Sequence, residues 1–395
     1  MSFKRTPSTA VDVPDMKRVP SVGSLSTNKA RHALDVVVDD VSYTVTNAKA
    51  SSEPLALLSN VTASFEHGKV HALMGASGAG KTTLLDVITD RVTSGEVSGG
   101  GVYYGGRRAS KAMFRQCAAY VEQRDTLLAM LTVKETLNYW AELRARNEEE
   151  RVEILARVPA IIEDLNLGEC SEVIVGDALK RGISGGQAKR TNLALALVTD
   201  PDVLFLDEPT SGLDSATSLD IVQILKHLAC SGVCVVATIH SPTSEAFRLF
   251  DSLLMLKKGR VAFAGALDSV TPYFRGLGYD YDASYSMADF FVGTVASDDV
   301  DFVGAFAKSA AGAANASRVK SMMSKQQLPA PPQPKITRGA MSKVATLIKY
   351  RTRYNYKTPD FVAARSAGNF LFGFVMMSLF WKIGEPTGAA QDQST

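Results

Sequence analysis

The sequence predicts an α/β fold in which parallel strands alternate with helices, with a helical insertion and one apolar helix near the C-terminus. Residues 203–208 and 233–240 are near-continuous apolar runs, as expected of parallel strands that are covered on both faces. Longer stretches with helical periodicity separate such runs. A chain of 395 residues, 46% of them hydrophobic, is long enough for one large domain with extensions.

The N-terminal segment, residues 1–34, differs in composition from the rest. It holds six Lys or Arg against two Asp and is rich in Ser, Thr and Pro, so we expect a disordered, solvated tail. It has no apolar core of a signal peptide, and the N-terminus is expected to stay in the cytosol. The formal net charge of +2 indicates no nucleic-acid partner. The four cysteines form no C-x-x-C pair, which favours reduced, structural thiols.

The main domain is expected over residues 35–300. Its first elements are a strand at 36–45, a buried strand at 70–75 and a helix at 82–92. The buried strand leads directly into a glycine-rich loop, and the helix follows that loop. This order of strand, loop and helix is one unit of an open α/β sheet.

Between residues 129 and 182 the strand signal nearly disappears. Thr132, followed three residues later by Glu135, forms a capping box, so a helix is expected to begin there. Residues 148–167 are a second amphipathic stretch, with a break or kink expected at Pro159. We therefore expect a helical subdomain over about residues 129–182, inserted into the α/β core.

Three segments are expected after the main domain. Residues 301–340 are rich in small residues and Pro and predict a flexible linker. Residues 341–361 predict a basic, amphipathic helix. The 16 residues 366–381 carry no charge, and a span of about 20 residues is reached if Arg365 snorkels. We expect a transmembrane helix over 362–384 with its N-terminal side in the cytosol; a buried core helix is the alternative.

The glycine-rich loop predicts nucleotide binding. It matches G-x-x-x-x-G-K-[ST] between an apolar strand and a helix, so a chance glycine-rich turn is disfavoured. Its glycines let backbone N–H groups form an anion nest, and the helix N-terminus adds partial positive charge. Lys81 is expected to reach the outer phosphates of ATP, and Thr82 to bind Mg²⁺. The expected nucleotide-binding residues of the loop are Gly75, Ala76, Ser77, Gly78, Ala79, Gly80, Lys81, Thr82 and Thr83.

Two acids end the apolar run at 203–208, at the edge of the sheet where ligands bind in open α/β folds. Asp207 is expected to hold Mg²⁺, directly or through water. Glu208 is expected to polarise the attacking water as general base. A solvated strand end is the alternative for the pair by itself, but a complete phosphate loop upstream favours the catalytic interpretation.

Three further features are less specific by themselves. A helix start at Ser184, Gly185, Gly186 and Gln187 predicts a second phosphate site, with a simple N-cap by the serine as the alternative. Gln123 lies in a polar loop between core and insertion, placed to sense Mg²⁺ and water. His240 ends an apolar strand, where its imidazole either contacts the γ-phosphate or is structural. One nucleotide needs one phosphate loop, so the second site suggests two copies of the domain.

Taken in order, these motifs resemble the nucleotide-binding domain of ABC transporters. The resemblance covers roughly residues 35–280, and its motifs are the phosphate loop, Gln123, ISGGQ at 183–187, VLFLDEP at 203–209, SGLDS at 211–215 and His240. One departure is Ile183 where the commonest signature has Leu, a conservative change.

The resemblance implies a shared catalytic site. Two such domains dimerise head to tail, with each ATP between the phosphate loop of one copy and residues 184–187 of the other. Glu208 polarises water and His240 steadies the γ-phosphate. Gln123 contributes to the Mg²⁺ site and couples it to the membrane part. Asp214 communicates across the dimer.

The subfamily follows from the later segments. Those that resemble the G (white and pleiotropic drug resistance) subfamily are TIHSPTSEAF at 238–247, GRVAFAG at 259–265, YFRGLGY at 273–279, ADFFVG at 288–293, the connecting helix at 347–361 and the first transmembrane helix from 369. Tyr43 is a candidate for stacking on adenine, with a plain strand residue as the alternative.

A half-size member of that subfamily has several transmembrane helices after the cassette, whereas this sequence has one. The expectation is a truncated half-size transporter, integral to a membrane, with its nucleotide-binding domain in the cytoplasm. Its expected partners are ATP, a second nucleotide-binding domain in a homo- or heterodimer, the lipid bilayer, and a transmembrane domain supplied by missing sequence or another chain. The expected function is ATP hydrolysis coupled to export of a lipophilic substrate.

Two alternatives stay open at this point. One is a truncated, non-transporting ATPase that acts by dimerising with a full transporter. The other is a soluble ABC ATPase of DNA maintenance or translation, which the short insertion and the apolar tail disfavour. The sequence does not identify the substrate, because in this subfamily the membrane helices select it.

Overall fold

The computed structural model describes residues 33–45, 54–124, 126–177, 180–282, 285–324, 338–356 and 359–381. The tail expected at 1–34 lies outside the described residues except for its last two positions. Of these, Leu34 is buried in the core.

A six-stranded sheet forms the centre of the main domain, in the order β10-β9-β3-β8-β7-β6. Five strands run parallel, and β10 is antiparallel to β9. The strands are β3 (Val70–Met74), β6 (Ala118–Val121), β7 (Val203–Leu206), β8 (Cys234–Thr238), β9 (Ser252–Lys257) and β10 (Arg260–Ala266). Every residue of β3, β7 and β8 is buried, which confirms the prediction from their apolar runs.

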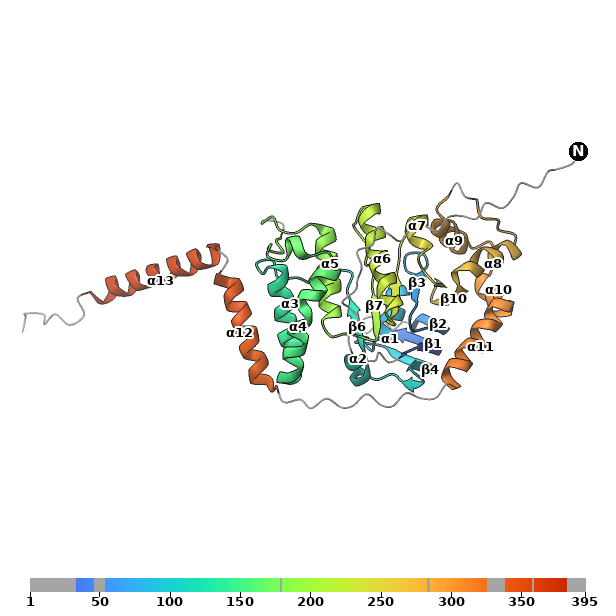
Figure 1. The fold of residues 1–395 in the computed structure, drawn as a ribbon, viewed down its shortest axis with the longest axis horizontal. Helices are drawn as coiled ribbons and strands as arrows, with labels where there is room; N and C mark the ends of the chain where they lie inside the picture. The colour runs from blue at the N-terminus through green and yellow to red at the C-terminus, as the bar shows by residue number, and fades with distance from the viewer. Residues whose placement is uncertain are drawn as a thin grey trace, which may run out of the picture.

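A four-stranded antiparallel sheet, in the order β2-β1-β4-β5, packs beside the central one (Figure 1). Its strands are β1 (Val36–Val45), β2 (Leu55–Phe65), β4 (Glu96–Tyr104) and β5 (Arg107–Arg108). The buried Tyr104 donates a hydrogen bond of 2.9 Å to the Ile88 carbonyl oxygen at the end of helix α1, Lys81–Ile88. This bond joins the second sheet to the helix that follows the phosphate loop.

Helix α1 is four residues shorter than the expected 82–92 at its C-terminal end. Thr89 caps it and donates its hydroxyl to the Leu85 carbonyl oxygen at 2.8 Å. Asp90 then takes a positive φ of 54°, which a helix does not accommodate. Local capping and a left-handed residue therefore end a helix that the apolar pattern alone would continue.

The helical insertion contains α3 (Val133–Arg144) and α4 (Glu148–Asp164), with a 3₁₀ turn at Gly168–Cys170. Thr132 and Glu135 form the predicted capping box. A break or kink was expected at Pro159, and the break is wrong, because α4 is one helix with the proline inside it. The packing of Val158 and Ile161 in the core stabilises α4 across the missing backbone bond.

Helix α5 (Gly185–Leu197) packs on both α3 and α4. The helical layer therefore continues past the expected boundary at 182, and it lies together on one side of the sheets in Figure 1. The remaining helices of the main domain are α2 (Lys111–Cys117), α6 (Ser215–Cys230), α7 (Ser244–Phe247), α8 (Val270–Gly276) and α9 (Met287–Ala296), with a 3₁₀ turn at Leu267–Ser269.

The flexible linker expected from residue 301 is wrong for its first part. Residues there form α10 (Phe302–Lys308) and α11 (Ala310–Ser324), which pack against β1, β2 and β10. The buried Asn315 donates to the Thr62 carbonyl oxygen at 2.9 Å. Alanine is the best helix former, and small side chains let α11 approach the sheet closely. The alanine-rich segment that was expected to be a flexible linker therefore forms a helix that packs on the sheet. Residues 325–337 lie outside the described residues.

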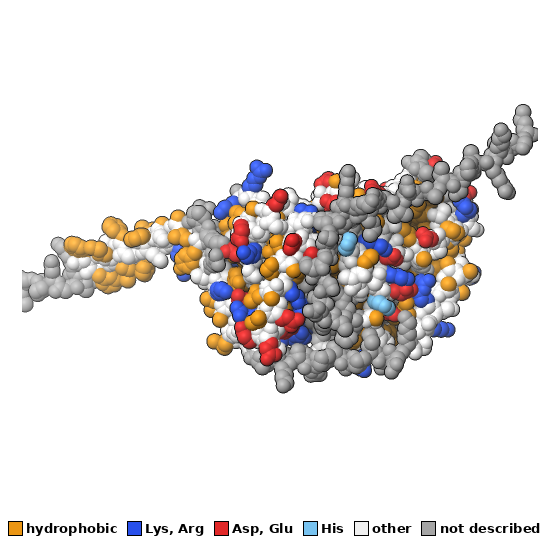
Figure 2. All heavy atoms as spheres, viewed as in Figure 1, with side chains coloured by type: hydrophobic (Ala, Val, Ile, Leu, Met, Phe, Trp, Pro, Cys, Tyr) orange, Lys and Arg blue, Asp and Glu red, His pale blue; other side chains and the backbone are white. Residues whose placement is uncertain are grey.

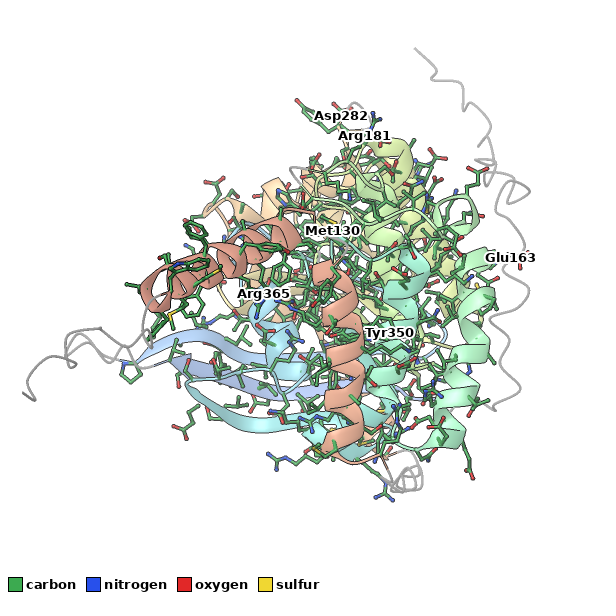
Figure 3. All side chains as sticks on the ribbon, turned by 90° about the vertical axis from the view of Figure 1, so that its left-hand side faces the viewer. Met130, Glu163, Arg181, Asp282, Tyr350 and Arg365 are labelled. Atoms are coloured by element: carbon green, nitrogen blue, oxygen red, sulfur yellow. The ribbon has the colours of Figure 1, made fainter. Side chains whose placement is uncertain are left out.

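Two helices follow, α12 (Ala340–Tyr356) and α13 (Pro359–Phe380). Helix α12 lies against α3, with the rings of Tyr350 and Tyr139 centred 5.0 Å apart (Figure 3). Helix α13 projects away from the rest, and its surface is largely hydrophobic (Figure 2). Among the described residues, it is the one helix long and apolar enough to cross a membrane, over Phe361–Phe380.

Candidate functional site

The phosphate loop connects β3 to α1 and needs its glycines. Gly75, Gly78 and Gly80 have φ values of 149°, 74° and 96°, in the region that side chains disfavour. A Cβ on Gly75 would lie 2.4 Å from the Leu256 carbonyl oxygen. The loop therefore takes a fixed shape that only glycine permits at this position.

Lys81 folds back over the phosphate loop. Its ammonium donates to the carbonyl oxygens of Gly75 and Ala76, at 2.9 and 3.1 Å. Burial lowers the pKa of this ammonium, while the charges of Glu208 and Asp207 act to raise it. The cation is thus held at the mouth of an anion nest by two carbonyl groups, which a phosphate group can replace.

Asp207 lies buried at the end of β7, next to the phosphate loop. Its backbone N–H donates to the Val121 carbonyl oxygen at 3.0 Å. The Thr82 hydroxyl donates to its Oδ1 and Oδ2, at 3.2 and 3.1 Å. The structure thus brings together two of the three residues that were expected at the Mg²⁺ site, and the third, Gln123, contacts Glu208 instead.

Glu208 follows with a positive φ of 45°, so its side chain turns away from the direction of the strand. Gln123 donates from Nε2 to Oε2 of Glu208 at 2.7 Å. Lys189, on α5, donates to the Gln123 carbonyl oxygen. The polar loop after β6 therefore contacts both the predicted general base and the helical layer.

His240 is exposed and lies just beyond β8. It shares with Glu208 a cavity of about 280 Å³ that residues 210–213 and 241–243 also line. A second cavity, of about 120 Å³, is lined by residues 76–79 of the phosphate loop. The structure therefore places His240 and Glu208 on the wall of one cavity, and residues 76–79 of the phosphate loop on the wall of another.

The segment 184–187 begins helix α5. Ser184 Oγ accepts from the backbone of Gln187, and Gln187 Oε1 accepts from the backbone of Ser184, which forms a capping box. The helix cap that the sequence left open is therefore present. Among the described residues, no hydrogen bond joins this segment to the phosphate loop of the same chain, at 75–83.

The segment 211–215 packs against the start of α5. Asp214 caps α6 by accepting from the backbone and hydroxyl of Thr217, at 2.9 and 2.7 Å. These hydrogen bonds hold the pKa of the Asp214 carboxyl below its usual value. A Cβ on Gly186 would lie 2.6 Å from the Thr217 methyl, so the two helix starts touch and a side chain at this position would displace Thr217.

The adenine-stacking role expected for Tyr43 is wrong. Tyr43 is buried in β1, and its hydroxyl donates to the Ser94 carbonyl oxygen. A Cβ on Gly95 would lie 3.0 Å from its ring, so this glycine packs directly against it. Alternation along the strand turns Tyr43 to the same buried face as Val41, and no ring face is left for a base.

Sequence reasoning missed Thr238, the last residue of β8. Its hydroxyl donates to Asp207 Oδ1 at 2.6 Å and accepts from the Glu208 backbone N–H at 2.7 Å. A hydroxyl two residues before His240, at the end of a strand otherwise apolar, is the signal that was available. It marks where β8 comes alongside the acids of β7.

Comparison with known proteins identifies the domain that holds the phosphate loop. The family model described as "ABC transporter" matches residues 58–211. "ABC transporter G family member 13" of Arabidopsis thaliana is 43% identical over 242 residues, which are 61% of this chain and 35% of that protein. The chain contains an ABC ATPase domain of the G-family type. ABC domains bind ATP, and the phosphate loop lies within the matched residues.

Two further matches describe the extent of the likeness. "ABC transporter G family member 6" of Arabidopsis thaliana is 29% identical over 372 residues, which are 87% of this chain and 51% of that protein. The chain thus spans about a third to a half of the length of these relatives. The ATP-binding cassette MJ0796, solved with ADP and phosphate, is 26% identical with a TM-score of 0.47, over 59% of this chain and 98% of that one.

Proposed function

We propose that this chain supplies the ATP-hydrolysing cassette of a G-family transporter and couples hydrolysis to export of a lipophilic substrate. The observation that carries the proposal is the junction at the end of β7. There Asp207 contacts Thr82, and Glu208 contacts Gln123. The names of the relatives and the apolar helix α13 support the transport part.

The Mg²⁺ site is proposed to be formed by Thr82, Asp207 and Gln123. Among the described residues, no group of three or more His, Cys, Asp or Glu side chains is placed to hold a metal. A site with few protein oxygens fits Mg²⁺, which usually keeps several waters and binds one or two protein groups plus substrate phosphates. When bound, the ion would neutralise negative charge on the phosphates.

Glu208 is proposed to act as the general base. Its carboxylate would take a proton from a water molecule whose oxygen attacks the γ-phosphorus, while the bond to the bridging oxygen of ADP breaks. Lys81 would leave the two loop carbonyl groups to hold the outer phosphates. His240, which lines the same cavity as Glu208, would steady the γ-phosphate. Gln123 would orient Glu208 and sense the occupied site.

A second cassette is proposed to complete each site. The segment 184–187 presents a helix start with backbone N–H groups, and Ser184 and Gly185 are exposed. It would contact the ATP of a second cassette, in a homo- or heterodimer. Asp214, at the neighbouring helix start, would then lie near the dimer contact and communicate across it.

Helix α13 is proposed to anchor the chain in a membrane, with the ABC domain in the cytoplasm. The candidate span has 20 residues and a mean hydropathy of 1.3, and its apolar window has no residue buried against the rest of the chain. At about 1.5 Å per residue it is about 30 Å long, the thickness of a bilayer core. In a test by flotation with liposomes, the full chain should float with the lipid. Recovery in a high-speed supernatant without detergent would contradict this anchor.

The test of the catalytic proposal is Glu208→Gln in the full chain in detergent micelles. The variant should bind ATP as the wild type does and should lose Mg²⁺-dependent phosphate release at least about 100-fold, since only the water-polarising group changes. Glu149→Gln, at an exposed position of α4, is the control. Comparable turnover in Glu208→Gln and wild type would refute the role. ATPase activity without transport in vesicles would favour a non-transporting ATPase that dimerises with a full transporter.

A further inference from the structure

Lys189 connects the helical layer to the catalytic loop within one chain. It lies on α5, two residues after Gln187, and its ammonium donates to the backbone carbonyl oxygen of Gln123. The side chain of that same Gln123 donates to Glu208 at 2.7 Å. One residue of the loop therefore has its backbone held by α5 and its side chain on the predicted general base.

The loop is also held just before Gln123. Arg91, which follows α1, pairs with Glu122, and its guanidinium lies 4.4 Å from the centre of the Tyr120 ring. The preceding Val121 accepts from the backbone of Asp207. The chain entering Gln123 is therefore tied to the α/β core, whereas the Gln123 carbonyl is tied to the helical layer.

We propose that Lys189 is a positioning residue for ATP hydrolysis, which sets the orientation of Gln123 toward Glu208 according to the position of α5. The proposal rests on the proposed function of Glu208 and Gln123. A charged donor on a carbonyl group makes a strong, directed hydrogen bond. Because α5 begins at the segment proposed to contact a second ATP, a shift of α5 moves Lys189, turns the peptide of Gln123, and changes its contact with Glu208.

The position of Lys189 suits this role better than a purely structural one. It is half-buried, and its ammonium reaches an exposed loop rather than the core of the helical layer. Exposed or half-exposed cation contacts contribute little to global stability. Removal of the ammonium should therefore change catalysis more than folding.

The experiment measures ATP hydrolysis by the full chain in detergent micelles for Lys189→Met, Lys189→Arg, Gln123→Ala and the double variant. Lys189→Met should lower kcat about 10-fold, with little change in KM for ATP or in melting temperature. Lys189→Arg keeps the charge and should recover most of the activity. If Lys189 acts through Gln123, the double variant should be no slower than Gln123→Ala alone.

Lys134→Met is the matched control, because Lys134 is an exposed lysine of α3 whose ammonium pairs with Glu172 at 2.9 Å. It should leave kcat unchanged. If the wild type is active, an unchanged kcat for Lys189→Met would overturn the inference. So would a double variant in which the separate losses of kcat multiply. A folded wild-type chain that binds ATP but does not hydrolyse it would overturn the proposed function as well. A lower melting temperature for Lys189→Met without rescue by Lys189→Arg would assign it a structural role instead.

Discussion

The Thr238 hydroxyl lies 2.6 Å from Oδ1 of Asp207 and donates a hydrogen bond to it. The Thr238 hydroxyl oxygen also accepts from the backbone N–H of Glu208, at 2.7 Å. One hydroxyl on β8 thus orients the predicted Mg²⁺ ligand and supports the left-handed turn that directs the predicted general base. Thr238 and Asp207 are buried and Glu208 is half-buried, so these two hydrogen bonds are shielded from exchange with water.

Thr238→Val keeps the shape of the side chain and removes the hydroxyl. We expect kcat for ATP hydrolysis to fall about 10-fold or more, because Asp207 and Glu208 both lose their orienting partner. The free energy of unfolding should fall by about 1–3 kcal/mol, since a buried carboxylate oxygen and an N–H lose a partner. Steady-state kinetics and urea unfolding measure the two effects. Thr238→Ser should restore both, and wild-type kinetics in Thr238→Val would contradict the role.

Tyr43→Leu tests whether the buried tyrosine has any part in nucleotide binding. The affinity of the folded protein for ATP should stay within about twofold of wild type, because the ring lies in the core. The free energy of unfolding should fall by about 2 kcal/mol through the lost packing. Binding of a fluorescent ATP analogue at low temperature measures the first quantity. A loss of ATP affinity in a fully folded variant would reinstate stacking on adenine.

Glu142→Gln tests how α12 is held on the helical layer. Glu142 is 7% exposed. Its Oε1 lies 3.0 Å from Lys349 Nζ, 3.3 Å from the Tyr350 hydroxyl and 3.6 Å from Arg151. Loss of the Glu142 charge should cost about 1–3 kcal/mol, because its hydrogen bonds to Lys349 and Tyr350 weaken while the exposed Lys349 ammonium stays solvated. Hydrogen–deuterium exchange should therefore accelerate in Ala340–Tyr356 of the variant.

The control for that prediction is Glu148→Gln. Glu148 is 66% exposed and pairs with the same Arg151 at the surface. A surface pair contributes about 0–1 kcal/mol, so exchange in α12 should not change. Equal exchange of α12 in both variants would show that Glu142 does not hold the helix.

The burial of His71 leads us to expect a loss of stability in mild acid. Burial lowers its pKa from 6.5 to about 4, and its ring nitrogens contact Ser252 and the Glu66 carbonyl. The unfolded chain takes up a proton near pH 6.5, whereas the folded chain does not until about pH 4. The stability that the neutral His71 ring contributes is therefore complete above pH 6.5 and is lost as the pH falls toward 4. At pH 5 the expected loss is about 2 kcal/mol in the free energy of unfolding.

Urea unfolding at pH 7 and pH 5 measures that loss. His71→Gln keeps a hydrogen-bonding side chain that does not titrate, so its stability should fall less than that of wild type over this range. The same acid dependence in both proteins would assign the effect to other groups.

Much of the fold was predictable because its signals are local. The strand at 36–45 agrees with β1, and the apolar runs at 203–208 and 233–240 contain β7 and β8. Helix ends were less predictable: α1 stops at Thr89, and α4 continues through Pro159. The first error comes from a cap that the apolar period does not encode. The second comes from core packing that offsets the cost of an interior proline.

The sequence by itself determined the candidate chemistry of this protein. The phosphate loop, the acids at 207 and 208 and the G-family motifs are short patterns, because the backbone and charge that phosphate binding needs are set by a few adjacent residues. Only the tertiary structure decided which distant groups serve that chemistry. It placed Thr238 on Asp207 and Lys189 on Gln123, turned Tyr43 into the core, and docked α11 on the sheet. Such contacts depend on strand register and helix packing between segments far apart in the chain, which local residue patterns do not specify.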